Sequence, residues 1–329
     1  MPLDGAALPF VLVRAGLLPP SRYLEAVGVV RDDAFWGRWA RNAVLAVAVG
    51  QLLAGIAFFF AFNWAELPPF AKLGLIQGGI VLCAAGAWIG RRHQIAWEAL
   101  LTAAAALVGV LLAVFGQIYQ TGADAYTLFV GWGLLILPWV VLARALPLWV
   151  LWLTVAGVGG FTYAVQVAIP LDRIDAETTM VLLAAFYAVA LLARELGARF
   201  GARFGFAWLQ PLWLRRLLVF VVLGLTFFLA APVVLDFGFG VEDGRLALVS
   251  FLLATIGLGA VYTWQRDLPA VVLAVLAGSL FLCTIGLRMA VDSDDLVGGS
   301  FLLLVVVAAV FGGALALLRR LRTWMLAHG

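Results

Sequence analysis

The chain has 329 residues, of which 65% are hydrophobic and only 12% are charged, and its mean hydropathy is +1.09. A soluble domain carries roughly 25% charged residues, so this composition excludes a soluble globular protein and indicates one that uses a lipid bilayer as solvent. The net charge of +3 does not indicate nucleic-acid binding, because the basic residues lie between apolar runs, where membrane topology explains them.

The apolar runs predict membrane-spanning helices. They are continuous rather than alternating, and most are long enough to cross roughly 30 Å of hydrocarbon as a helix. Hydrocarbon also requires every backbone polar group to be bonded within the protein, and helices meet this requirement. We therefore predict an all-α, polytopic transmembrane helix bundle of about ten spans. In chain order the predicted spans are 43–62, 70–90, 96–116, 126–142, 147–169, 178–193, 217–235, 246–263, 268–287 and 297–318.

The predicted spans divide the chain into three expected regions. Residues 1–42 form a cytoplasmic or interfacial segment of short helices, because Pro19 and Pro20 divide its apolar stretches. Residues 43–169 form a first half of five spans, and residues 170–329 form a second half of five.

The basic residues give the predicted orientation. Most of the 21 Lys and Arg residues lie in the N-terminal segment, in alternate loops and in the C-terminal tail. The positive-inside rule then places both termini in the cytoplasm. The arginines of loop 194–216 are expected to anchor the chain at the inner interface, and binding of anionic lipid is the alternative.

The outer loop after the first predicted span carries the first candidate site residues. Asn63, Trp64 and Glu66 precede two prolines, which suit a turn followed by a helix start. Lys72 follows in the first turn and is the only lysine in the chain. Snorkelling to the outer interface explains this lysine, and a compact ammonium that serves binding on the side that avoids positive charge is the alternative.

A second polar segment closes the third predicted span and opens the fourth. Gln117 and Gln120 are three residues apart and are expected to share one helix face, with Tyr119 between them. Asp124 stands where the N-cap of the next helix is expected. By the predicted topology both segments lie on the outer side, where they can converge on one substrate-binding pocket.

No catalytic, metal or cofactor site is predicted. Cys83 and Cys283 lie inside apolar runs, and His93 and His328 have no partner pattern around them. No motif of a P-loop, a zinc protease or a nucleophile elbow occurs. An enzyme acting on a lipid-linked substrate is therefore the least favoured class of protein.

Two motifs carry a resemblance. The patterns N-W-x-x-L-P-x-x-x-K, beginning at Asn63, and G-Q-I-Y-Q-x-G-A-D, ending at Asp124, are followed by L-P-W at 137–139. Together they resemble an uncharacterised family of bacterial integral inner-membrane proteins, best over residues 10–165. The resemblance implies a multi-pass protein of the bacterial inner membrane and supplies no activity.

The lipid bilayer is the expected partner of the chain. Two hypotheses about its function remain open. The first is a carrier of a small neutral or cationic solute that uses the outer polar pocket. The second is a non-transporting envelope sensor or assembly module, in which the pocket binds a periplasmic protein or ligand.

Overall fold

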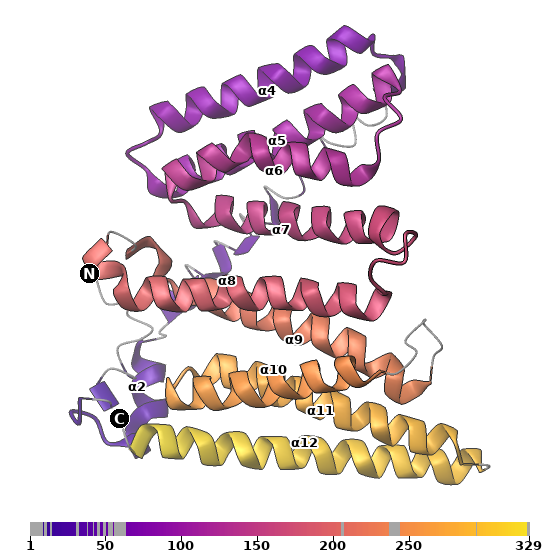
Figure 1. Cartoon of the computed structure of the whole chain (residues 1–329). Coiled ribbons are helices and arrows are strands. Elements are labelled where there is room, and N and C mark those ends of the chain that lie inside the picture. The colour runs from indigo at the N-terminus through magenta and orange to yellow at the C-terminus, as the bar shows by residue number, and fades with distance from the viewer. Residues whose placement is uncertain are drawn as a thin grey trace. The chain divides into compact units, whose positions relative to one another are not determined.

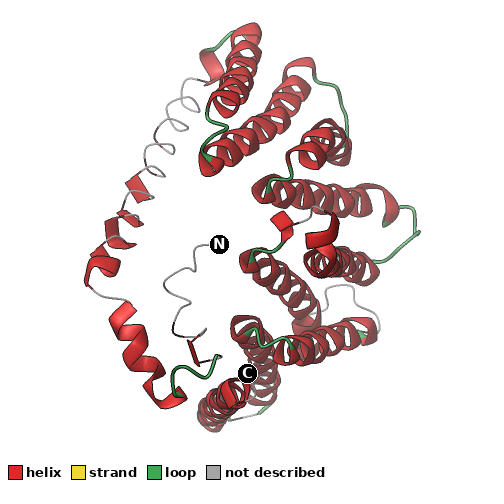
Figure 2. Cartoon of the chain, turned by 90° about the vertical axis from the view of Figure 1, so that its left-hand side faces the viewer, coloured by secondary structure: helices red, strands yellow, loops and turns green. Residues whose placement is uncertain are grey.

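The structure of the chain, a computed structural model, describes Pro9, residues 12–13 and 15–30, scattered positions from 33 to 55, and residues 64–327 except 205–206, 237–243 and 294. Every regular element in this described part is a helix (Figure 2). The chain divides into two compact units. One unit is Met1–Pro68 with Leu317–Gly329, and the other is Pro69–Ala316.

Within the described residues, nine helices are long and apolar enough to cross a membrane. Nine of the predicted spans are confirmed as helices, while the first predicted span, 43–62, lies largely outside the described residues. The nine are α4 (Pro69–Ile89), α5 (Gln94–Tyr119), α6 (Ala125–Ala143), α7 (Leu146–Tyr163) with its π-helical extension η4 (Ala164–Ala168), α8 (Ala176–Phe204), α9 (Leu212–Leu235), α10 (Arg245–Trp264), α11 (Leu268–Val291) and α12 (Leu296–Ala327).

Local sequence sets where these helices begin and end. Proline occupies the first turn of α4, α7 and α11, where its missing N–H has no helical partner to lose. Left-handed backbone at Gln120, Arg144 and Asp236 ends α5, α6 and α9. Consecutive helices run antiparallel, so the loops alternate between two ends of the second unit (Figure 1). We call these the α5–α6 end and the α8–α9 end, after one loop at each.

Helices α5, α6 and α7 pack through tryptophans and small residues. The Trp132 indole nitrogen donates a hydrogen bond to the Ala105 carbonyl oxygen at 2.9 Å, across the α5–α6 contact. Gly109 permits this approach, because a Cβ there would lie 2.5 Å from the Trp132 ring. The buried core of these helices consists of Ala105, Ile136, Val140, Ala145 and Leu148.

Helix α9 is the centre of the second group of helices and packs against α8, α10 and α11. Leu218, Val219 and Ala230 are among its buried side chains. Elsewhere the nine helices leave large apolar side chains exposed, for example Leu82 and Leu253. Such surfaces suit contact with lipid tails and would be unfavourable in water.

The first unit contains shorter elements in its described residues. A 3-10 turn η2 (Pro20–Arg22) leads into α2 (Tyr23–Val30), and a second turn, η3 (Trp64–Glu66), precedes α4. The guanidinium of Arg322 lies 5.2 Å from the centroid of the Tyr23 ring. This cation–π contact joins α2 to the C-terminal part of α12 within the unit.

Candidate functional site

The end of α5 and the start of α6 form a groove that contains part of the predicted site. Gln120 ends α5 in a left-handed conformation, and Gly122 turns the chain with a φ of +60°. The groove has a volume of about 350 Å³. Its polar side chains belong to Gln117, Thr121, Asp124 and Thr127, and its apolar wall includes Leu112, Phe115, Leu128 and Gly131.

Asp124 is the N-cap residue of α6 by position but not by side-chain bonding. Its backbone is extended, and its carbonyl oxygen accepts hydrogen bonds from the Thr127 N–H at 3.0 Å and the Thr127 hydroxyl at 2.6 Å. The carboxylate makes no capping hydrogen bond to the helix. The sequence therefore predicts the position correctly, while the side chain stays exposed in the groove and is not engaged by the helix end.

The other residues of this segment play different parts. Gln117 is the last glutamine inside α5 and lines the groove. Tyr119 packs its ring on the Phe115 ring, with 4.5 Å between the two ring centroids. Gln120 lies beyond the helix, and its N–H bonds to the Gly116 carbonyl oxygen. The expectation that Gln117 and Gln120 share one helix face is therefore wrong, because the helix ends between them.

The first predicted segment is described only in part. Asn63 lies outside the described residues. Trp64 and Glu66 form the turn η3 in the first unit, with Glu66 exposed. Lys72 lies in the first turn of α4 and is half-buried in the second unit. The convergence of these residues with the α5–α6 groove stays a prediction.

A contact beside the groove connects it to α7. The Tyr126 N–H, in the first turn of α6, donates to the Gln166 side-chain oxygen at 3.2 Å. The Tyr126 and Tyr163 rings meet edge to face, with 5.4 Å between their centroids. Gln166 belongs to the π-helical segment η4, and such segments often occur at functional sites because they displace side chains from the regular helical positions.

A buried charge network at the α8–α9 end was missed by sequence reasoning. Glu195 of α8 accepts hydrogen bonds from Arg194 at 2.8 Å and from Arg215 of α9 at 2.7 and 2.9 Å. Asp267, the N-cap of α11, accepts from Arg215 at 3.1 Å and from Arg216 at 3.3 Å. Three helices are thereby joined at one end.

Further contacts complete this charge network. Arg194 also donates to the backbone carbonyl oxygens of Gln210 and Pro211, at 2.9 and 3.0 Å. The Arg215 guanidinium lies 5.3 Å from the centroid of the Tyr262 ring. Arg194 and Arg215 therefore stabilise the bundle internally. The expectation that they are interfacial anchors or lipid ligands is replaced by ion pairing with Glu195 and Asp267.

A signal for the network does exist in the sequence. Glu195 and Asp267 are carboxylates at the ends of predicted spans, on the side where arginine is concentrated. Carboxylates near the bilayer are expensive unless they are paired, so each of them needs a cation. Among the described residues no group of three or more His, Cys, Asp or Glu side chains is placed to hold a metal ion.

The apolar helices and their exposed surfaces define an integral membrane protein. Residues 12–149 match the family described as "Predicted membrane protein (DUF2157)". The matched range includes the α5–α6 groove and excludes the charge network. The match supports an uncharacterised membrane family and gives no activity. No curated protein and no solved structure matches the chain.

Proposed function

We propose that this chain is a non-transporting binding protein of the membrane, and that its α5–α6 groove takes a small cationic or neutral polar ligand. The observation that carries the proposal is the Asp124 carboxylate, which stands at a helix N-cap without capping it. A carboxylate not used by the helix, in a groove shared with the Gln117 amide, offers a cation an ionic partner and a hydrogen-bonding partner.

The depth of the groove favours binding over transport. Its deepest lining residues are Leu112 in α5 and Gly131 in α6, each six or seven residues from the helix end. At a rise of 1.5 Å per residue this is about 10 Å. Half of the hydrocarbon core is about 15 Å, so the groove within these two helices stops short of the midplane. A carrier site is usually found near the midplane.

The proposed binding is tested by ligand-dependent stabilisation. The purified chain in detergent is screened with small organic cations and neutral polar solutes, and the melting temperature is recorded for each. A ligand should raise the melting temperature of the wild type and lose this effect in Asp124→Asn and Gln117→Ala. Gln94→Ala is the matched control, because Gln94 is an exposed amide at the opposite end of α5. Equal stabilisation of all four proteins would refute the groove as the binding site.

The carrier hypothesis makes a different prediction for the same ligand. Proteoliposomes that contain the chain should accumulate a labelled solute if it is carried, and Gln117→Ala should abolish that uptake. We expect stabilisation without uptake. Uptake that depends on Gln117 would instead establish the carrier.

The proposed setting is the bacterial inner membrane, with both termini in the cytoplasm and the α5–α6 end outside. In that orientation the groove faces periplasmic ligands or a periplasmic protein, and residues 1–42 face the cytoplasm, where they can report binding. The division of the spans into two halves of five, residues 43–169 and 170–329, belongs to the same proposal. A membrane-impermeant thiol reagent tests the orientation, because it should label Thr121→Cys in intact spheroplasts and leave Gln94→Cys unlabelled.

A further inference from the structure

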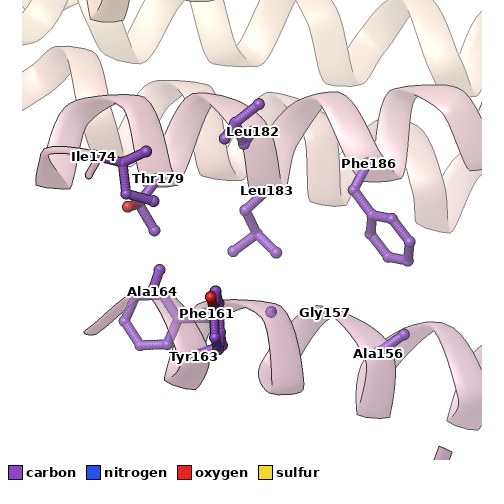
Figure 3. Close-up of a pocket in the computed structure, with 11 residues that line it drawn as sticks. Ala156, Gly157, Phe161, Tyr163, Ala164, Ile174, Thr179, Leu182, Leu183 and Phe186 are labelled. Atoms are coloured by element: carbon purple, nitrogen blue, oxygen red, sulfur yellow. The ribbon is translucent and has the colours of Figure 1, made fainter. Parts of the chain in front are cut away.

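A second groove lies between α7 and α8, and its walls are almost entirely apolar (Figure 3). It has a volume of about 310 Å³. Helix α7 contributes small residues and two aromatic rings to one wall, and α8 contributes Leu183 and Phe186 to the other. The one lining hydroxyl inside α8, that of Thr179, already donates to the Asp175 carbonyl oxygen at 2.8 Å. The groove therefore suits an apolar occupant.

Glycine and tyrosine keep this groove open. The Tyr187 hydroxyl of α8 donates to the Leu153 carbonyl oxygen of α7 at 3.3 Å, which fixes the spacing of the two helices. Gly157 makes room for that hydroxyl, because a Cβ there would collide with it. Gly160 lies one turn further along α7, where a Cβ would meet nothing within 4 Å. The open space beside Gly160 therefore lies between two helices, α7 and α8, whose spacing is fixed.

The groove has the length of one membrane leaflet. Phe186 lies ten residues into α8, about 15 Å from the helix start at the α5–α6 end. Ala156 lies about as far into α7 from the opposite end. Half of a hydrocarbon core is also about 15 Å. The groove thus runs from Ile174, just before α8, and Tyr163, five residues inside the end of the α7–η4 span, to Ala156 and Phe186 in the middle parts of their spans.

We propose that the α7–α8 groove is a binding site for one acyl chain of a bilayer phospholipid from the leaflet at the α5–α6 end. The surrounding helices are membrane spans, so lipid tails already contact this surface. A groove of one-leaflet length with apolar walls matches a single acyl chain in length and in chemistry. The chain terminus lies beside Ala156 and Phe186, and its ester end lies beside Tyr163 and Ile174. This inference does not depend on the proposed ligand of the α5–α6 groove.

Photo-cross-linking in proteoliposomes tests the site. The probes are two phosphatidylcholines, one with a diazirine at the end of an acyl chain and one with a diazirine near its ester. Peptide mapping should place the chain-end label near Ala156 and Phe186, and the ester-end label near Tyr163 and Ile174. Gly160→Phe places a ring in the open space of the groove and should lower both labels about tenfold.

The control is Gly224→Phe, because Gly224 lies on α9 with nothing within 4 Å of its added Cβ. Labelling of α7 and α8 should be unchanged in this variant. Gly160→Leu is the milder substitution if Gly160→Phe lowers the melting temperature, and it should reduce labelling in the same direction.

Two results would overturn the proposal. Labels spread evenly over α4 to α12, with no response to Gly160→Phe or Gly160→Leu, would mean that the groove holds ordinary boundary lipid only. A disulfide-linked dimer of Gly160→Cys, made in a chain without Cys83 and Cys283, together with weak lipid labelling, would mean that a second copy fills the groove.

Discussion

Arg215 binds Glu195 through two parallel hydrogen bonds, Nε to Oε1 at 2.7 Å and Nη2 to Oε2 at 2.9 Å, and so ties α9 to α8. The exposed fractions of the two side chains are only 13% and 11%. If either side chain were removed, water could therefore solvate the remaining charge only weakly. The same guanidinium reaches Asp267 at 3.1 Å, so three helices depend on one arginine at the α8–α9 end.

Glu195→Gln should destabilise the folded chain by about 3 kcal/mol, because removing one partner of a buried pair leaves the other charge uncompensated. Here two arginines, Arg194 and Arg215, would lose their shared carboxylate. The melting temperature in detergent or the midpoint of unfolding in SDS measures the effect.

Asp292→Asn is the matched control for Glu195→Gln. Asp292 pairs with Arg288 at 2.7 Å, but 54% of the Asp292 side chain is exposed. An exposed pair of this kind contributes no more than about 0.5 kcal/mol in most proteins. Equal losses in the two variants would show that burial does not decide the importance of these pairs.

Gly109→Val should separate α5 from α6. The added Cβ would lie 2.5 Å from the ring of Trp132, whose indole is held by its hydrogen bond to Ala105. Overpacking of this kind costs about 1–3 kcal/mol. Gly78→Val on α4 is the control, since a Cβ there meets nothing within 4 Å. The prediction is checked by comparing the two melting temperatures, and a larger loss in the Gly78 variant would contradict it.

The spans could be predicted because the bilayer imposes one rule on every residue it touches. A run such as 217–235 must be helical and apolar to lie in hydrocarbon at all, so local composition suffices. The charge network involves pairs 20 and 52 residues apart in the sequence, and no local pattern reports which helices meet. The arginines could therefore be interpreted as topological signals, but their carboxylate partners could not be predicted.

The candidate site was predictable to a similar extent. Polar residues at a span end indicated the α5–α6 groove, because such residues are unusual beside hydrocarbon. The separation of Gln120 from the helix face of Gln117 was not predictable, since it depends on the residue at which α5 stops. The α7–α8 groove also escaped notice, because its glycines and alanines have the same composition as close helix packing.

Asp175→Ala should weaken the start of α8 in a pH-dependent way. The Asp175 carboxylate accepts the Thr178 N–H at 2.7 Å and so caps the helix. Hydrogen bonds from the Thr178 side chain and backbone hold the pKa of Asp175 below its usual value. Since the folded pKa is the lower one, the stabilisation is present above the unfolded value of about 3.9 and is lost as the pH falls through the folded pKa.

The measurement for Asp175→Ala is its melting temperature against that of the wild type at several pH values. Loss of a cap typically costs about 1 kcal/mol, and this difference should be full at pH 7 and shrink below about pH 4. A difference that stays constant across the whole range would show that the carboxylate charge has no part in the cap.

Asp124→Ala should behave differently from Asp175→Ala, although both aspartates stand at helix N-caps. The Asp124 carboxylate makes no capping bond to α6, so its removal should leave the melting temperature at pH 7 unchanged. The same substitution should abolish stabilisation by any ligand of the α5–α6 groove. Equal destabilisation of the two variants would mean that Asp124 caps α6 after all, and the groove would then lose the carboxylate on which its proposed function depends.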